Sequence, residues 1–247
     1  MSKKNLARKK ETGEHECADW KVGPTHHLES EDITRWRATT IRNYVRFCRV
    51  PYENLLWMTI IHNAIETTHT AGPFSVSEII EEAEAGIASR CRRKLPGIRI
   101  RGVHEIDVVR YGNHASSHKM RLMEDFGIDL TPSRSEEEKG RIVIPHLHCV
   151  IDIDRYHPSR VREEFAAQFP GYKRTFATKL HSFRPVKDNL ETLGQYSTKL
   201  KLAYSNAWNT RQTKFGDPYE PEWISYIVMS LSHHGLDNLN FSYGCNR

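Results

Sequence analysis

Two histidines one residue apart stand in the segment of the chain that most strongly predicts a β-strand. His146 and His148 lie within residues 142–153 (IVIPHLHCVIDI). Because side chains alternate in a strand, we expect both histidines on one face, about 7 Å apart, and Leu147 and Cys149 on the other, toward the core. Two imidazoles at this spacing can hold one divalent metal ion if a neighbouring strand supplies a third ligand.

The preceding strand-like segment, residues 98–110 (IRIRGVHEIDVVR), offers that third ligand. Ile106 has the apolar character of a core residue, so Glu105 is expected on the opposite face, toward the histidines. Asp107 is the spare candidate, and His104 is a weaker one. One carboxylate and two imidazoles leave coordination positions open for substrate oxygens, as a catalytic metal requires.

A tyrosine and a lysine further along the chain could act with such an ion. Asp188 is expected to cap a helix that runs to Tyr204, and this places Tyr196 and Lys199 on one helical face. Tyrosine can be a covalent nucleophile, but its hydroxyl has an ordinary pKa near 10 and needs nearby positive charge. Alone, the Y-x-x-K spacing is more typical of an ordinary amphipathic helix.

The elements that would position these residues alternate between helical and strand patterns. The sequence predicts an α+β fold with a ferredoxin-like or RRM-like antiparallel sheet, helices packed on one face, and helical additions at the N- and C-terminal ends. A possible capping box at Ser75–Glu78 starts the second helix. Helices are expected over 33–49, 75–94 and 159–168, with a short one at 117–126 inside a long loop, and strands over 55–61, 98–110, 142–153 and 174–184.

The chain divides into four parts by composition and pattern. Residues 1–30 predict a basic and polar tail with little order, and residues 31–54 an N-terminal helix. Residues 55–205 hold the predicted catalytic core, and residues 206–247 form a C-terminal extension.

Charge and composition favour a polyanionic partner only weakly. The 247 residues carry a formal net charge of +5, and 38% are hydrophobic, enough for a buried core. The absence of a long apolar run and of a CxxC pair argues against a membrane span, a disulfide framework and a zinc ribbon, so a cytoplasmic location is expected. A cluster of arginines provides candidate nucleic-acid contacts: Arg92, Arg93, Arg99 and Arg101.

Three motifs in this order resemble those of the HUH endonucleases, and in particular the rolling-circle replication initiators. The segment 55–60 (LLWMTI), with Thr59 near its end, is similar to the first motif. The segment 145–148 (PHLH) is similar to the second, and 196–199 (YSTK) to the third. The likeness covers residues 55–204.

The resemblance implies a site- and strand-specific nickase and ligase. His146, His148 and Glu105 would hold Mg²⁺ or Mn²⁺, Tyr196 would form a 5′-phosphotyrosine intermediate, and Lys199 would stabilise the transition state. Thr59 would lie near the bound DNA. The implied partners are single-stranded DNA at an origin or hairpin, and a host replication helicase. Some family members use two tyrosines, which makes Tyr204 a second candidate nucleophile.

Two other interpretations stay open. A single-tyrosine transposase of the same superfamily would share the site and move a DNA element instead. A non-catalytic nucleic-acid-binding module could use the same ferredoxin-like sheet, but such modules place aromatic rings on the sheet face for base stacking. Here the corresponding face is expected to carry Glu105, His146 and His148, which favours metal chemistry.

Overall fold

The computed structural model describes most of the α+β core. It covers residues 30–70, 74–111, 117–129, 140–167, 177–179, 185–199 and 218–245. The helices are α1 (Ser30–Val45), α2 (Phe74–Lys94), α3 (Ser117–Asp125), α4 (Pro158–Ala166), α5 (Val186–Tyr196) and α6 (Pro221–His234). The strands are β1 (Leu55–Ile61), β2 (Ile65–Thr67), β3 (Arg99–Val109), β4 (Arg141–Asp152), β5 (Ala177–Lys179) and β6 (Asn240–Tyr243).

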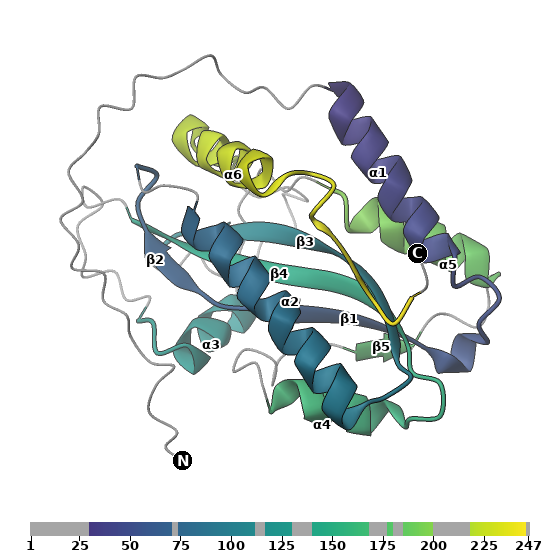
Figure 1. The fold of residues 1–247 in the computed structure, drawn as a ribbon. Coiled ribbons are helices and arrows are strands. Elements are labelled where there is room, and N and C mark those ends of the chain that lie inside the picture. The colour runs from purple at the N-terminus through teal and green to yellow at the C-terminus, as the bar shows by residue number, and fades with distance from the viewer. Residues whose placement is uncertain are drawn as a thin grey trace.

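The strands form one antiparallel sheet in the order β5-β1-β4-β3-β6, and β2 pairs separately with β4 (Figure 1). The long strands β3 and β4 lie side by side along most of their length. In their register Glu105 lies opposite His146 and Val103 lies opposite His148. The predicted α+β class and antiparallel sheet are therefore confirmed, and the topology is consistent with a ferredoxin-like fold.

One face of the sheet packs against α2, α4 and α6. Leu147 and Cys149 point to this face, as expected, and pack with Ile87 of α2 and Phe165 of α4. Farther along the same face, α6 contributes Trp223 and other apolar residues to a second buried cluster. Alternation of apolar residues in β3 and β4 therefore buries their side chains on this face.

Helices also cover the opposite face: the expected N-terminal helix lies there, and α3 and α5 add to it. Helices α1 and α5 lie side by side over one end of this face, where Tyr44 and Leu190 pack against Val150 (Figure 1). Helix α3 covers the other end, where Leu122 packs with Ile144. The strands carry apolar residues at both ends of this face, and these residues need cover from water.

Several expected helix boundaries are wrong. Helix α2 begins at Phe74, so Ser75 lies inside the first turn and does not cap the helix. Pro185, not Asp188, occupies the N-cap position of α5, and α5 ends at Tyr196. The expected continuation to Tyr204 falls outside the described residues, as do the predicted tail and most of the strand expected at 174–184. No helix in the described ranges is long and apolar enough to cross a membrane.

A chain of polar side chains is buried between α2 and the sheet. The Nε2 atom of His62 lies 3.0 Å from Nδ1 of His104, and Nε2 of His104 lies 2.9 Å from a carboxylate oxygen of Glu84. Both rings can be neutral: Nε2 of His62 then donates to Nδ1 of His104, and Nε2 of His104 donates to Glu84. Burial is the main reason that the pKa of His104 is lowered to about 3 and that the pKa of His62 also lies well below its usual value.

Acidification should therefore destabilise the fold through these histidines. Each binds a proton readily when unfolded and poorly when folded, so its contribution is complete above about pH 6.5 and is lost at lower pH; for His104 the loss continues until the pH approaches 3. The free energy of unfolding should drop by about 1.4 kcal/mol per pH unit for each such histidine. Urea denaturation at several pH values should show a shallower dependence for His104→Gln, and an unchanged dependence would contradict the assignment.

A close helix contact generates a second prediction. Gly194 of α5 lies against α1, and a Cβ atom added there would be 2.9 Å from the Cα atom of Ile41. Gly194→Ala should push the helices apart and lower the free energy of unfolding by about 1–3 kcal/mol. Thermal unfolding would measure this loss. Mn²⁺ affinity should stay unchanged, because none of the metal-site candidates lies on either helix; a loss of stability close to zero would show that the contact is not tight.

Candidate metal centre and nucleophile

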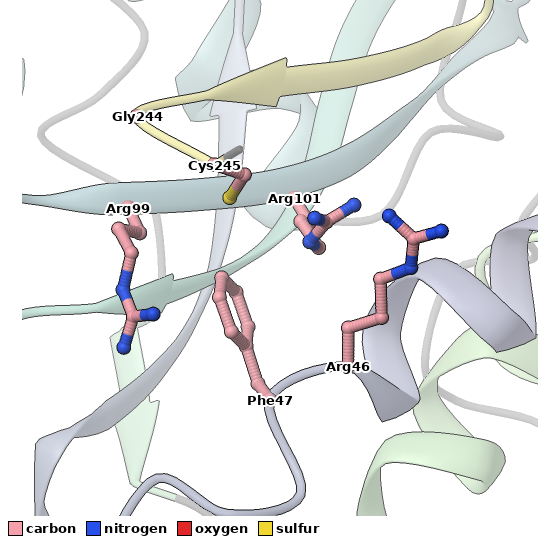
Figure 2. A pocket seen from close by; sticks show the side chains of 6 residues that line it. All are labelled: Arg46, Phe47, Arg99, Arg101, Gly244 and Cys245. Carbon is pink, nitrogen blue, oxygen red and sulfur yellow. The ribbon is translucent and has the colours of Figure 1, made fainter. Parts of the chain in front are cut away.

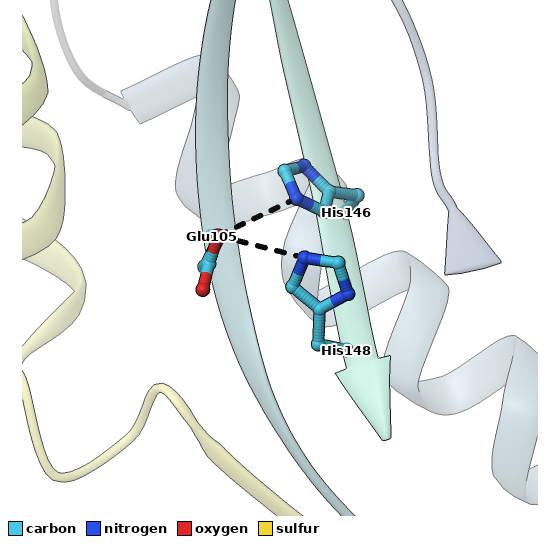
Figure 3. Close-up of side chains that lie close together, drawn as sticks. All are labelled: Glu105, His146 and His148. Carbon is cyan, nitrogen blue, oxygen red and sulfur yellow. Dashed lines mark ion pairs between the residues drawn. The ribbon is translucent and has the colours of Figure 1, made fainter. Parts of the chain in front are cut away.

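Glu105, His146 and His148 meet on the face of the sheet between α3 and the α1–α5 pair. The Nε2 atoms of His146 and His148 lie 3.7 and 3.6 Å from the same carboxylate oxygen of Glu105 (Figure 3). One potential ligand atom from each side chain lies within 4.8 Å of the others. A metal ion about 2.1 Å from each ligand needs ligand atoms roughly 3 to 3.5 Å apart, so small side-chain movements would suffice.

Hydrogen bonds orient both imidazoles with Nε2 toward Glu105. Nδ1 of His146 lies 3.0 Å from the carbonyl oxygen of Ile144, which can only accept, so Nδ1 carries the proton and Nε2 is the available ligand atom. Nδ1 of His148 lies 2.7 Å from the hydroxyl oxygen of Thr59, its partner on β1. Such secondary contacts fix ring orientation in metal sites.

The electrostatic surroundings favour a cation at this position. Burial disfavours the imidazolium form of His146, but the hydrogen bond with Glu105 and the charges of Asp107 and Glu105 outweigh burial and raise its pKa. A metal ion would use the same negative potential. His104 points to the opposite face, toward Glu84, and is therefore excluded as a ligand. Asp107 is not part of the three-residue cluster, but its charge acts on His146.

The two histidines are buried, contrary to the expectation that they face outward. Their exposed fractions are 6% for His146 and 7% for His148. Trp57 of β1 stacks on the ring of His148, with ring centroids 5.4 Å apart and an angle of 12° between the planes. The alternation of the strand predicted the correct face, but not the side chains that cover it.

Tyr196 lies beside this cluster and remains open to solvent. Its ring centroid is 5.6 Å from that of His148 and 6.4 Å from that of Trp57, and the residue is 52% exposed. Lys199 lies beyond the end of α5, so the two residues do not share a continuous helix. The turn nevertheless brings the Lys199 ammonium to 5.6 Å from the centre of the Tyr196 ring.

Tyr44 of α1 contacts both β4 and the segment that follows α5. Its hydroxyl donates a hydrogen bond to the carbonyl oxygen of His148 at 2.8 Å and lies 3.3 Å from the hydroxyl of Ser197. Burial above all holds the pKa of Tyr44 well above its usual value, so the donor stays protonated. Arg37 of α1 also donates to the carbonyl oxygen of Thr198 at 3.4 Å. Sequence reasoning missed both residues, because neither belongs to a local motif.

The candidate DNA-binding residues are spread over three places. Thr59 lies in the site, where its hydroxyl contacts His148. Arg99 and Arg101 line a separate pocket on the same face of the sheet. Arg92 and Arg93 lie in the last turn of α2, which covers the opposite face. The structure therefore does not bring Arg92 and Arg93 to the cluster.

The donor set fits a catalytic metal ion better than a closed structural site. Three protein ligands leave positions open for substrate, whereas structural zinc sites usually have four. Each imidazole is already oriented, and the one carboxylate faces both. The described residues therefore form a cluster that could hold a divalent ion next to an exposed phenol.

Direct metal titration tests this arrangement. His148→Gln should weaken Mn²⁺ binding by about 100-fold or more because a ligand is lost, and Thr59→Val by about 10-fold because the His148 ring loses its orienting partner. Isothermal titration calorimetry measures both changes. The exposed residue His69 provides a control, since His69→Ala should bind Mn²⁺ as the wild type does. Wild-type affinity in His148→Gln would rule out this centre.

Comparisons with known proteins identify no relative of the chain. No protein-family model matches it, and no curated protein or solved structure is significantly similar to it. The chemistry of the site therefore has to be argued from the geometry of Glu105, His146, His148 and Tyr196.

Proposed function

We propose that this chain is a metal-dependent endonuclease that cuts single-stranded DNA with Tyr196 as the nucleophile, in the manner of the HUH rolling-circle initiators that its motifs resemble. One observation carries the proposal. A solvent-exposed tyrosine ring lies 5.6 Å from a histidine of a buried cluster that also contains His146 and Glu105. Tyr196 and the cluster come from distant parts of the chain, so their proximity does not follow from local sequence.

The chain's residues would divide the reaction between them. Glu105, His146 and His148 would hold Mg²⁺ or Mn²⁺, of which Mn²⁺ accepts nitrogen ligands more readily. The chemistry that a bound ion supplies is polarisation of the scissile phosphate and compensation of its charge. Lys199 would stabilise the negative charge that develops on the phosphate.

The proposed step is a transesterification at the scissile phosphate. The phenol oxygen of Tyr196 forms a bond to phosphorus and gives up its proton to water. The bond from phosphorus to the 3′ oxygen breaks, and that oxygen takes up a proton to become a free 3′-hydroxyl. The resulting phosphotyrosine is a phosphodiester, so attack by a 3′-hydroxyl can reverse the step and reseal a strand.

The geometry supports a catalytic site over a base-stacking platform. In an RNA-recognition type of module, aromatic rings lie exposed on the sheet so that bases can stack on them. Here Trp57 is already stacked on His148, and the neighbouring strand positions carry Glu105 and the histidines. A single-tyrosine transposase would use the same residues, and only the DNA substrate distinguishes it from a replication initiator.

Tyr196→Phe tests the nucleophile. This variant keeps the ring and its packing but lacks the hydroxyl, so it should fold, bind Mn²⁺ and bind DNA normally. Incubation with labelled single-stranded oligonucleotides and Mn²⁺ should give no cleavage and no covalent adduct. Lys199→Ala should cut with a rate lower by about 100-fold, because one charge-stabilising group is lost.

The outcomes separate the alternatives. Tyr52 is also an exposed tyrosine but belongs to no cluster, so Tyr52→Phe serves as a matched control and should form the adduct at the wild-type rate. If Tyr196→Phe still forms an adduct, Tyr204 becomes the candidate nucleophile. Cleavage by Tyr196→Phe without an adduct would mean that water attacks, and the proposed mechanism would be wrong.

A further inference from the structure

A pocket lies on the same face of the sheet as the cluster of Glu105, His146 and His148 and contains none of these residues. It has a volume of about 220 Å³, and Figure 2 shows the residues that line it. Its walls come from the segment after α1, from β3 and from the segment after β6. The lining residues are Arg46, Phe47, Arg99, Arg101, Gly244 and Cys245. Three of these six residues carry a positive charge.

Arg101 is the central observation, because its charge is buried without a carboxylate partner. The residue is only 6% exposed, and its Nε atom has no hydrogen-bond partner in the described part of the chain. The groups that face it are neutral: the side-chain oxygen of Asn43, 3.5 Å from Nη1, and the Cys245 side chain, which accepts a hydrogen bond from the guanidinium. Burial is the main reason that the pKa of Arg101 is lowered; the Cys245 side chain opposes this shift, and the charges of Arg46 and Arg99 add to it. A buried cation in such surroundings calls for an anion.

Of the other two arginines in the pocket, only Arg99 has a carboxylate partner among the described residues. Arg99 forms an ion pair with Asp152, with its Nε atom 2.9 Å from the carboxylate. Arg46 forms no ion pair with any described residue. The ring of Phe47 lies under Arg99 and Arg101, at 5.6 and 5.8 Å from their guanidinium carbons, and so holds both in place without neutralising them. The pocket therefore carries more positive than negative charge.

The wall formed by Gly244 is tightly fitted. Gly244 has a φ of +65°, and a Cβ atom there would lie 2.4 Å from the carbonyl oxygen of Ile98. A larger residue could not take this path along β3. This wall of the pocket is thus formed by backbone packed against Ile98 and Arg99, and not only by long side chains.

The size of the pocket indicates what kind of anion it fits. Pockets that enclose a whole small molecule are usually about 300–1,000 Å³, and this one is smaller. It suits a phosphate group presented by a longer chain better than an enclosed free nucleotide. Arg101 and Glu105 are four residues apart on β3 and point to the same face, which corresponds to about 13 Å. A strand bound at the metal cluster could reach the pocket within a few nucleotides.

We infer that this arginine pocket binds a backbone phosphate of the single strand, away from the phosphate that is cut, and so anchors the strand across β3. The inference rests on the proposed function for the kind of strand that is bound. Anchoring itself needs no metal and no nucleophile, so it can be measured when the chemistry is switched off.

Binding of a fluorescent single-stranded oligonucleotide in EDTA tests the inference. Arg101→Gln and Arg46→Gln should each weaken binding by about tenfold, because a charge-assisted contact is lost. Each should also reduce the slope of log affinity against log salt by about 0.7. Arg162→Gln is the matched control, since Arg162 is exposed on α4 at the other side of the sheet, and it should change the affinity much less.

Thermal unfolding gives an independent readout. Inorganic phosphate should stabilise the wild type and not Arg101→Gln, and the variant should be at least as stable as the wild type without phosphate, because an unpaired buried charge has been removed. If Arg101→Gln does not fold, the exposed Arg46→Gln variant still decides the matter. Wild-type affinity and salt dependence in Arg46→Gln would overturn the inference.

Further outcomes distinguish a failure of the strand anchor from a failure of the proposed nickase activity. If ATP or inorganic phosphate displaces the oligonucleotide at the concentration where the oligonucleotide itself binds, the pocket serves a free phosphate compound, and the strand anchor is wrong. Arginine-dependent binding without any adduct in Mn²⁺ would keep the anchor and reject the nickase. An adduct that forms at the same oligonucleotide concentrations in Arg46→Gln and Arg101→Gln as in the wild type would keep the nickase and reject the anchor.

Discussion

The register between β3 and β4 determines whether the candidate site exists. Glu105 faces the two histidines because it lies opposite His146 in the antiparallel pair. A slip by one residue would turn Glu105 to the other face and leave both imidazoles without a carboxylate. Close packing opposes such a slip: a Cβ atom on Gly102 would lie 2.8 Å from the carbonyl oxygen of His148, so only glycine fits this position in β3.

The position of Tyr196 depends on the packing of α1 against α5. Helix α1 packs against α5 at Gly194 and reaches the end of α5 through Tyr44 and Arg37. These contacts hold Tyr196 beside His148 while leaving its ring open to solvent. His146 and His148 are buried, whereas Tyr196 is 52% exposed, so under the proposed function a polymer can reach the phenol while the candidate ligands stay covered.

The parts of this arrangement that follow from local periodicity could be predicted from the sequence. Alternation in β3 and β4 placed Glu105, His146 and His148 on one face, and apolar composition located the main strands. The boundaries of α5 were missed because its N-cap is Pro185 and its last turn ends at Tyr196. The burial of the histidines, the hydrogen bond of Thr59 and the role of Tyr44 were missed because they depend on contacts between distant segments. The unpaired charge of Arg101 likewise has no signature in sequence.

The contact between Tyr44 and Ser197 also bears on the order in which the parts of the site form during folding. These residues are 153 positions apart, so their pairing closes a very long loop and is a slow, late event in folding. The β3–β4 pair, by contrast, needs only the chain between the two strands. During synthesis Glu105, His146 and His148 can thus come together before α5 has left the ribosome. Under the proposed function, a phenol that is positioned only in the finished chain would keep a partly made protein from attaching itself to DNA.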